Sequence, residues 1–389
     1  MKRSLVVTLT LALLLAFTSV TLAAEPIVIG FITALTGPTS LWGNQEANGA
    51  KLRVEEINAA GGVLGRPLKL IIYDHKGTPQ EGVLAYRRLV DEDKAVAVLG
   101  THFSNISLAI APVAEQKRVP IVGQALEPRV TIPALGQLNK YNFIAQPSAI
   151  EQGQMPARFA WETLKAKTAA VLADKSNSYS ASQADAFVAY FKELGGKVVA
   201  DIDYAANTVD YKAQLTQIKA ANPDVIYLPN YAQPGGMQVK QAKELGIKAT
   251  FLGCNSLSDP PFMAAAGGPE NVNGLYFLFN ANFADKKYAK FIADFKAKYG
   301  APPETYHSLF GYDDVTVLAE AIKKAGAADS EKIRTAIENL KDVPIMLGNG
   351  KFTMDPKTHR VRNMPSWIFK WNEKGERIPL DLIYPAELK

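Results

Sequence analysis

The chain has 389 residues, of which 21% are charged and 48% hydrophobic, and it holds one cysteine. At about 150 residues per domain we expect two or three domains, each able to bury a core without staples. The composition is close to the globular average, which excludes disordered, collagen-like and coiled-coil chains, and one cysteine excludes a disulfide framework. A formal net charge of +5 without a clustered basic patch excludes a nucleic-acid partner.

The first two dozen residues have the three parts of a secretory signal peptide. Lys2 and Arg3 precede an apolar run over 5–20, and small residues follow it. This order is typical of an exported protein. An uncleaved membrane anchor is the alternative, but the run is shorter than the ~20 apolar residues that a spanning helix needs. We therefore predict a signal peptide over 1–24 and an exported mature chain.

After this segment, short apolar runs rich in β-branched residues alternate with helical patterns. The runs that predict strands are 27–32, 68–74, 96–100, 120–122, 168–172, 198–202, 225–228 and 250–253. The patterns that predict helices include 46–58, 79–91, 182–194, 211–221 and 237–245. Nearly all-apolar strands separated by amphipathic helices indicate parallel sheets covered on both faces. One sheet would need too many strands, so we predict an α/β fold with two doubly wound parallel-sheet domains.

Three further extended runs stand apart from this alternation. They cover 141–146, 274–279 and 350–353, and Pro147 follows the first of them. Helical patterns over 286–299, 313–325 and 330–340 lie between the last two runs. We place the first domain boundary at Pro147, about 120 residues into the mature chain.

The sequence shows no catalytic or metal-binding constellation. The four histidines are not spaced as a pair of metal ligands on a helix, and no nucleophile elbow or phosphate-binding loop is present. An enzyme of this length normally shows one of these sets. We therefore expect a protein that is not an enzyme and that carries no metal or cofactor.

Polar and aromatic side chains instead gather directly after the predicted strands. Six such segments come from both halves of the chain, at 36–43, 101–107, 124–127, 174–180, 230–233 and 254–259. Open α/β sheets bind ligands outside the carboxyl ends of their strands. Trp42, Phe103, Tyr179 and Tyr231 suit the walls of an apolar pocket, and amides at helix N-termini suit an anion. Turn or cap chemistry explains each residue alone, but the six segments together predict a small-molecule site.

Several short segments, in a fixed order and spacing, carry a family resemblance. They are residues 35–38 (Leu-Thr-Gly-Pro), 43, 57–65 with the following 70–74, 179–180, 193–196, 222–226 and 311–313. Through them the chain resembles, over about residues 25–375, the periplasmic substrate-binding proteins of branched-chain amino acid ABC transporters, the leucine/isoleucine/valine-binding family.

The resemblance implies a type I periplasmic binding protein fold, with two lobes joined by three crossovers. Residues 25–145 and 280–350 would form lobe 1, and residues 148–275 and 353–389 would form lobe 2. The hinge would lie near 141–147, 274–279 and 350–353, where the three extended runs fall.

The resemblance also implies a function and partners. A receptor of this kind closes two lobes over an amino acid, an amide or a similar small molecule and delivers it, in the periplasm, to a membrane ABC permease. We expect it to be a monomer. A ligand sensor of the same fold is the alternative, and an exported hydrolase with an unrecognised site is a third hypothesis.

In lobe 1 the family pattern implies contacts with both ends of an amino acid ligand. Ser104, beside Asn105, matches the serine that holds the ligand carboxylate, and Ala125 matches the residue whose carbonyl accepts the ligand ammonium. Glu127 stands where the family has a threonine that helps to bind the carboxylate. Because a fixed anion would repel a carboxylate at close range, we expect Glu127 to meet a donor on the ligand instead.

In lobe 2 the pattern implies a covering wall and a counter-charge. Tyr179 and Tyr231 match the tyrosines that cover the ligand. The family pairs the ligand ammonium with an acidic residue in the loop that matches 254–259, and here Asn255 or Ser256 replaces it. Because of this change and Glu127, the sequence does not name the ligand.

Overall fold

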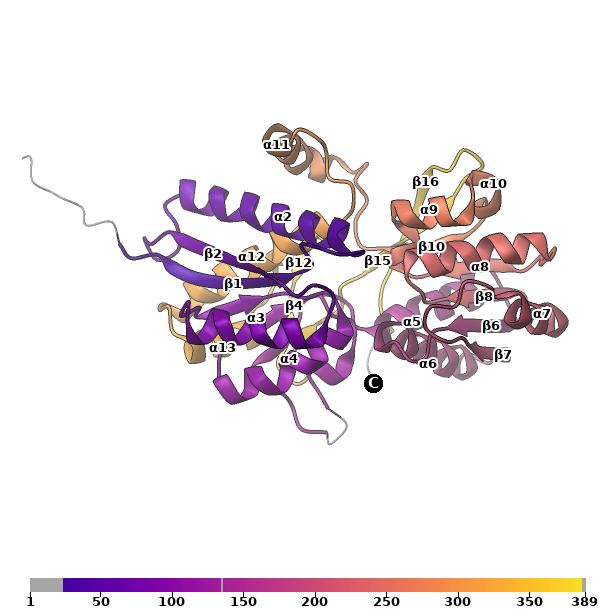
Figure 1. Cartoon of the computed structure of the whole chain (residues 1–389), viewed down its shortest axis with the longest axis horizontal. Coiled ribbons are helices and arrows are strands. Elements are labelled where there is room, and N and C mark those ends of the chain that lie inside the picture. The colour runs from indigo at the N-terminus through magenta and orange to yellow at the C-terminus, as the bar shows by residue number, and fades with distance from the viewer. Residues whose placement is uncertain (1–23, 134–135, 387–389) are drawn as a thin grey trace, which may run out of the picture.

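The computed structural model describes residues 24–133 and 136–386, so nearly all of the predicted signal peptide lies outside the described residues. Strands and helices alternate along the chain and build two lobes, each around one seven-stranded sheet (Figure 1). In the part of the chain that the structure describes, no helix has the length and apolar character needed to cross a membrane.

Lobe 1 is built on a sheet with the strand order β13-β14-β5-β4-β3-β1-β2. All of its neighbouring strands are parallel except β13 and β14. Its strands are β1 (Ile27–Thr33), β2 (Leu68–Asp74), β3 (Ala97–Leu99), β4 (Ile121–Gly123), β5 (Asn142–Ile144), β13 (Met354–Asp355) and β14 (Arg360–Val361). The helices of this lobe are α2 (Ser40–Ala59), α3 (Pro79–Asp91), α4 (Ser104–Lys117), α11 (Ala289–Tyr299), α12 (His307–Ala325) and α13 (Ser330–Glu338).

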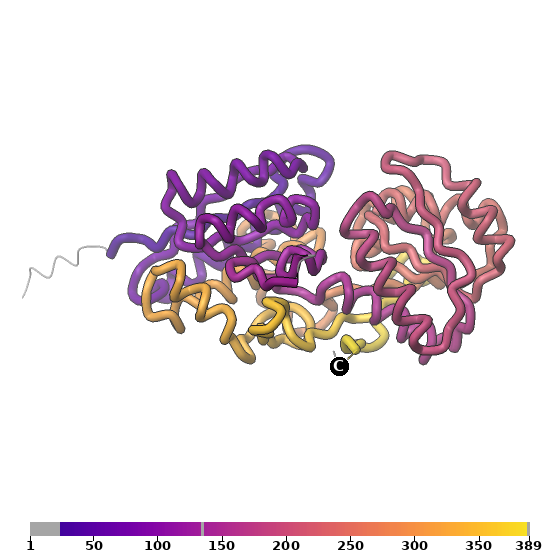
Figure 2. Tube along the Cα trace, turned by 90° about the horizontal axis from the view of Figure 1, so that it is seen from below, coloured from indigo at the N-terminus to yellow at the C-terminus, as the bar shows by residue number. Residues whose placement is uncertain are grey.

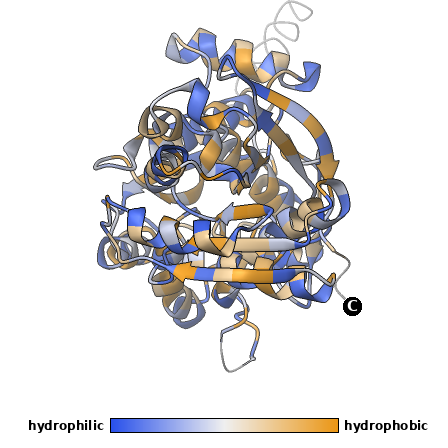
Figure 3. Cartoon of the chain, turned by 90° about the vertical axis from the view of Figure 1, so that its right-hand side faces the viewer, coloured by the Kyte–Doolittle hydropathy of each residue, from blue (hydrophilic) through white to orange (hydrophobic). Residues whose placement is uncertain are grey.

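Lobe 2 repeats this plan with the strand order β16-β15-β10-β9-β8-β6-β7. Its strands are β6 (Thr168–Ala173), β7 (Lys197–Asp203), β8 (Val225–Leu228), β9 (Thr250–Gly253), β10 (Tyr276–Phe279), β15 (Ser366–Trp371) and β16 (Arg377–Ile383), of which β15 runs antiparallel to both neighbours. Its helices are α5 (Ala149–Arg158), α6 (Ser178–Glu193), α7 (Lys212–Ala221), α8 (Ala232–Glu244), α9 (Pro260–Ala266) and α10 (Pro269–Val272). Figure 3 looks at this lobe from its outer end and shows apolar and polar residues mixed along its helices, as expected where one helix face covers a sheet.

Short elements complete the chain. They are the 3-10 turns η1 (Pro128–Val130), η3 (Asn255–Ser258) and η4 (Lys286–Tyr288), the π-helical turn η2 (Phe159–Thr163), and a small antiparallel pair of β11 (Val343–Pro344) and β12 (Lys351–Phe352). Of these, η3 matters most for function, because it follows β9 at the carboxyl end of the lobe 2 sheet.

Both sheets reverse their winding after the first strand, which confirms the prediction of two doubly wound lobes. In lobe 1 β1 lies between β2 and β3, and in lobe 2 β6 lies between β7 and β8. Fully buried strands such as β8 have helices on both faces, which explains their unbroken apolar sequence. Such a reversal opens a crevice at the carboxyl ends of the strands.

The chain passes between the lobes three times (Figure 2). The first passage starts after Ile144 and leads into α5, so only the last part of the predicted 141–147 belongs to it and the rest contains β5 of the first sheet. The run 274–279 is not a linker, because it contains β10 of the second sheet, and the second passage starts after Phe279.

The third passage differs most from the prediction at 350–353. Residues 354–361 form the hairpin of β13 and β14, and Arg360 pairs with Ile144 at the edge of the first sheet. Lobe 1 therefore continues through Val361, and the passage lies at 362–365, before β15. The hairpin strands are too short to be recognised by periodicity.

Two glycines let the helices α2 and α12 touch through their backbones. A Cβ atom on Gly49 would lie 1.8 Å from the carbonyl oxygen of Ser308, and one on Gly311 would lie 2.0 Å from that of Glu46. Any larger residue at either position would push the helices apart. This close approach brings Glu46 and the first turn of α12 to the face where the lobes meet.

Candidate functional site

A pocket lies between the two lobes, at the carboxyl ends of both sheets, with about 370 Å³ of space that includes a part open to solvent. Lobe 1, including the start of α12, lines it with Trp42, His102, Leu126, Tyr306, His307 and Phe310. Lobe 2 lines it with Tyr179, Tyr231, Asn255, Ser256 and Asp259, and Gln146 reaches it from the first passage. A molecule bound there would contact both lobes.

Five of the ten predicted site residues line this cavity. They are Trp42, Tyr179, Tyr231, Asn255 and Ser256. Four of the five belong to lobe 2, so the structure brings together most of the predicted second-lobe wall.

The other five predicted residues lie outside the lining. Phe103 is buried behind His102, with ring centroids 3.9 Å apart. Ser104 is buried at the start of α4 and its hydroxyl has no hydrogen-bond partner. Ala125 lines a separate small cavity inside lobe 1. Asn105 and Glu127 contact lobe 2 outside the cavity.

Glu127 has other partners than the predicted ligand donor. Its side chain is buried, and Arg129 donates to both of its oxygens at 2.8 and 2.9 Å. Ser182 of lobe 2 donates a further hydrogen bond at 2.7 Å. Because Arg129 folds back from only two residues away, it neutralises the carboxylate that was expected to face the ligand.

Stacked aromatic rings form the apolar wall of the cavity. The rings of Tyr179 and Tyr231 are parallel within 12°, with centroids 4.8 Å apart. The Tyr179 hydroxyl donates to Asn255 Oδ1 at 2.7 Å, which fixes the orientation of that ring. From lobe 1, the Trp42 ring lies 6.2 Å from Tyr231 and 5.9 Å from His307. These flat surfaces suit an apolar or aromatic part of a ligand.

Asp259, which follows η3, supplies the acidic group of this cavity. It is 2% exposed, and its Oδ2 has no hydrogen-bond partner. Burial raises the pKa of its carboxyl to about 8, against the opposing effects of Arg377 and of donors on Ser258 and Trp42. The indole N–H of Trp42 is close enough to act on this pKa but does not reach full hydrogen-bond geometry.

His102 lines the cavity from lobe 1 and pairs with the buried Glu46 behind it. His102 Nδ1 lies 2.5 Å from Glu46 Oε1, and the other oxygen of Glu46 accepts a hydrogen bond from Thr33 at 2.5 Å. The opposite nitrogen of His102, Nε2, is buried without a partner. Burial also holds the pKa of His307 well below its ordinary value, so this ring is neutral.

The cavity therefore offers unpaired hydrogen-bonding atoms of both kinds. Trp42 Nε1 is a donor, and Asp259 Oδ2 accepts when the carboxyl is ionised and can donate when it is protonated. The tautomer of the His102 ring decides whether its Nε2 donates or accepts. Buried polar atoms are normally paired, so a polar ligand that bridges these atoms would be stabilised. Among the described residues no cluster of His, Cys, Asp and Glu could hold a metal ion.

Comparison with known families defines the class of this protein. The family model described as "Periplasmic binding protein" matches residues 26–376. The chain therefore belongs to the periplasmic binding protein family, as its resemblance predicted.

Individual relatives extend over nearly the whole chain. It is 30% identical over 366 residues to the "Leu/Ile/Val-binding protein BraC3" of Rhizobium johnstonii, covering 94% of this chain and 96% of that protein. An "Amino acid binding protein" of Pseudomonas aeruginosa is 31% identical, with 91% and 92% covered. Among solved structures, the leucine binding protein LivK of Thermotoga maritima has a TM-score of 0.82 at 29% identity, covering 93% of this chain and 100% of that one.

A second solved structure shows a related protein with its ligand. It is LivJ of Streptococcus pneumoniae in complex with isoleucine, with a TM-score of 0.81 at 28% identity. The match covers 92% of this chain and 100% of that chain. Both lobes of this chain therefore have counterparts in an amino acid-binding protein.

Sequence reasoning missed part of the lining. His102 and Asp259 lie in segments that the strand-end pattern identified, at 101–107 and 254–259, but side-chain direction decides which residue of a loop faces the cavity. Tyr306, His307 and Phe310 gave no such signal, because they open helix α12 and follow no strand. The sequence predicts this helix only from residue 313 onward, so its first turn carries no predicted site residue.

Proposed function

We propose that this protein is the extracytoplasmic solute-binding component of an ABC importer, and that it binds an amino acid between its lobes and delivers it to the permease. Family membership and the amino acid-binding relatives support this proposal. It includes export by the signal peptide over 1–24, a periplasmic location, action as a monomer, and no enzymatic activity or cofactor.

The observation that carries the proposal is the pairing of an aromatic wall with one buried carboxylate. The rings of Tyr179, Tyr231 and Trp42 suit an apolar side chain. Asp259 Oδ2, without a partner, suits the ligand ammonium. An ammonium at hydrogen-bond distance would favour the ionised form of Asp259, so ligand binding would release the proton that burial retains.

The ligand carboxylate needs donors, and none of the cavity-lining residues is a lysine or an arginine. We assign it to hydrogen-bond donors on the lobe 1 side. These are the indole of Trp42 and the ring of His102, both of which line the cavity. Oriented dipoles at the start of α4 would assist them.

A thermal-shift series tests the proposal directly. We expect L-leucine, L-isoleucine or L-valine to stabilise the protein, by about 2.7 kcal/mol at a concentration of 100 times the dissociation constant. The 2-oxo acid of leucine, which lacks the amine, and leucinamide, which lacks the carboxylate, serve as matched probes and should stabilise less. A folded protein that no amino acid in a full panel stabilises would contradict the proposal.

A further inference from the structure

Two pairs of side chains join helix α6 of lobe 2 to lobe 1 outside the ligand cavity. Ser182 Oγ donates to Glu127 Oε2 at 2.7 Å, and Ser178 Oγ donates to Asn105 Oδ1 at 2.5 Å. The two serines lie one turn apart on α6 of lobe 2, so their hydroxyls share a helix face. Asn105 and Glu127 belong to lobe 1. These four residues are called the clasp below, and none of them lines the cavity.

Glu127, one of the two lobe 1 residues of the clasp, is held by a residue of its own lobe. Arg129 donates to both carboxylate oxygens of Glu127 through its side chain and to Oε1 through its backbone N–H at 3.0 Å. Burial opposes ionisation of Glu127, but the hydrogen bonds from Arg129 and Ser182 outweigh it and keep its pKa below the ordinary value. Ser182 therefore meets a fixed, charged acceptor, which makes the stronger kind of hydrogen bond.

Each clasp contact exists only while the lobes are together. Its two partners sit on different lobes, so separation of the lobes breaks both bonds and returns the polar groups to water. Each bond therefore shifts the equilibrium between separated and closed lobes by much less than the energy of the bond itself. When only a fraction of the molecules is in the form that binds ligand, the apparent affinity equals the intrinsic affinity multiplied by that fraction.

We propose that the clasp is a ligand-independent device that sets the balance between separated and closed lobes, and that it tunes ligand affinity without touching the ligand. Asn105 and Glu127 are then positioning residues, whereas the sequence had assigned them to the ligand. Substitution of a clasp residue should change the affinity for every ligand by the same factor. Substitution of a residue in the cavity wall should change the affinity for each ligand by a different factor.

Serine variants separate these two behaviours. We expect Ser182→Ala to weaken the binding of L-leucine and of L-isoleucine by the same factor, roughly 3- to 10-fold in calorimetry. Ser182→Thr keeps the hydroxyl and should restore most of the affinity. Ser176→Ala is the matched control, because Ser176 Oγ bonds only to Asp174 of its own lobe, at 2.5 Å. Unequal factors for the two ligands, or a loss in the control as large as in Ser182→Ala, would overturn the proposal.

A measurement without ligand separates failure of the clasp from failure of the proposed function. Spin labels are placed on Leu84→Cys in α3 and Lys192→Cys in α6, both exposed, while the native Cys254 is buried. We expect the distance distribution of the ligand-free protein to shift toward longer distances when Ser178→Ala and Ser182→Ala are combined, and not with Ser176→Ala. Asn105→Ala, made from the other lobe, should shift it in the same direction. Identical distributions in all folded variants would overturn the proposal.

Discussion

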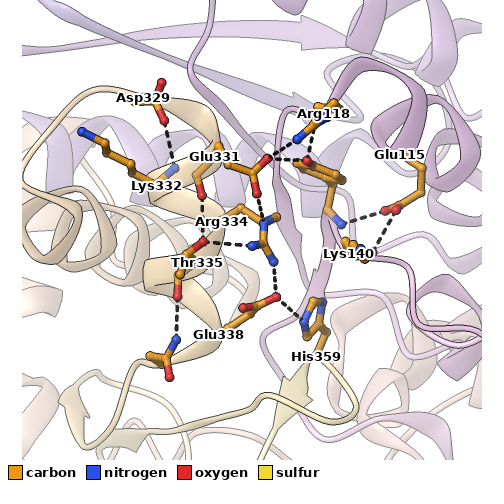
Figure 4. A network of polar contacts seen from close by, with 12 residues as sticks. Glu115, Arg118, Lys140, Asp329, Glu331, Lys332, Arg334, Thr335, Glu338 and His359 are labelled. Atoms are coloured by element: carbon orange, nitrogen blue, oxygen red, sulfur yellow. Dashed lines mark hydrogen bonds and ion pairs between the residues drawn. The ribbon is translucent and has the colours of Figure 1, made fainter.

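The ligand cavity and the ion network of lobe 1 each contain a carboxyl group, but in opposite surroundings: Asp259 in the cavity is buried, whereas Glu331 in the network is partly exposed. In the network Glu331 accepts hydrogen bonds from Tyr141 at 2.5 Å, Arg334 at 2.7 Å and Arg118 at 3.0 Å (Figure 4). These donors lower the pKa of Glu331 to about 2. In the cavity Asp259 has an oxygen without a partner, and burial raises its pKa to about 8.

The network in Figure 4 joins segments that are far apart in the sequence. Arg334 also pairs with Glu338, whose Oε1 lies 3.0 Å from His359 Nε2, just before β14. The network thus ties α13 to the end of α4 and to the hairpin that extends the first sheet. The contrast teaches that paired carboxylates hold this fold together, whereas the unpaired one is available to a ligand.

The largest effect is expected from Asp259→Asn. The variant removes the proposed partner of the ligand ammonium and should weaken amino acid binding by about 2–3 kcal/mol, which is roughly 30- to 150-fold, the strength of a charged hydrogen bond. The ligand-free protein should unfold at the same temperature or higher, because an unpaired buried carboxyl is removed. Calorimetry and thermal unfolding check both parts. If the variant and the wild type bind leucine with equal affinity, Asp259 does not bind the ligand, and this would contradict the proposed difference between the cavity and the network.

The reverse pattern is expected from Arg334→Ala. It leaves Glu331 and Glu338 without a shared donor and should lower the free energy of unfolding by about 1–2 kcal/mol, since the guanidinium is mostly buried while its partners are partly solvated. Leucine affinity should not change. Urea unfolding measures the free energy of unfolding, and calorimetry measures the affinity for leucine. A loss of affinity with unchanged stability would contradict the structural role of the network.

The two carboxyls should also respond to pH in different windows. The raised pKa of Asp259 makes its contribution to stability greatest below an ordinary carboxyl pKa of 3.8, and this contribution is lost as pH rises toward about 8. The lowered pKa of Glu331 makes its contribution complete above 4.5, and this contribution is lost as pH falls toward about 2. Arg377 and Tyr306 lie close enough to influence Asp259, and His102 and His307 share its cavity.

Unfolding followed over pH in wild type, Asp259→Asn and Glu331→Gln separates these windows. Each variant should flatten the profile only in its own window. A change in the acid limb caused by Asp259→Asn alone would contradict the assignment of the two pKa shifts.

The smallest effect is expected from Tyr231→Phe. The ring stacks on Tyr179 and its surface, rather than its hydroxyl, forms the wall. Leucine affinity should change less than threefold, whereas Tyr231→Ala should cost about 2 kcal/mol through lost apolar burial. Calorimetry of both variants checks the wall. A larger loss in the Phe variant would mean that the hydroxyl bonds the ligand.

The fold was predictable because its signals are local and repeated. Nearly all-apolar strands such as Val225–Leu228 report burial on both faces, and the helices between them report one covered face. The last crossover was not predictable, because β13 and β14 have two residues each and are strands only through their pairing with the first sheet.

The sequence predicted which loops form the site, but it did not predict which side chains of those loops line the cavity. The loop 254–259 was identified, and the family pattern pointed to Asn255 or Ser256 in place of its acidic residue. It did not point to Asp259, which follows the turn η3 and also lines the cavity. Glu127 was assigned to the ligand because the guanidinium that folds back from Arg129 is not visible in a motif. Tyr306 and His307 depend on the glycine contact between α2 and α12, which joins segments some 260 residues apart.

Native mass spectrometry of the exported protein tests the central claim most directly. The wild type should carry one amino acid with a free amine, and Asp259→Asn, purified in the same way, should have lost it while Arg334→Ala retains it. A bound molecule without an amine, or equal occupancy of wild type and Asp259→Asn, would contradict the account.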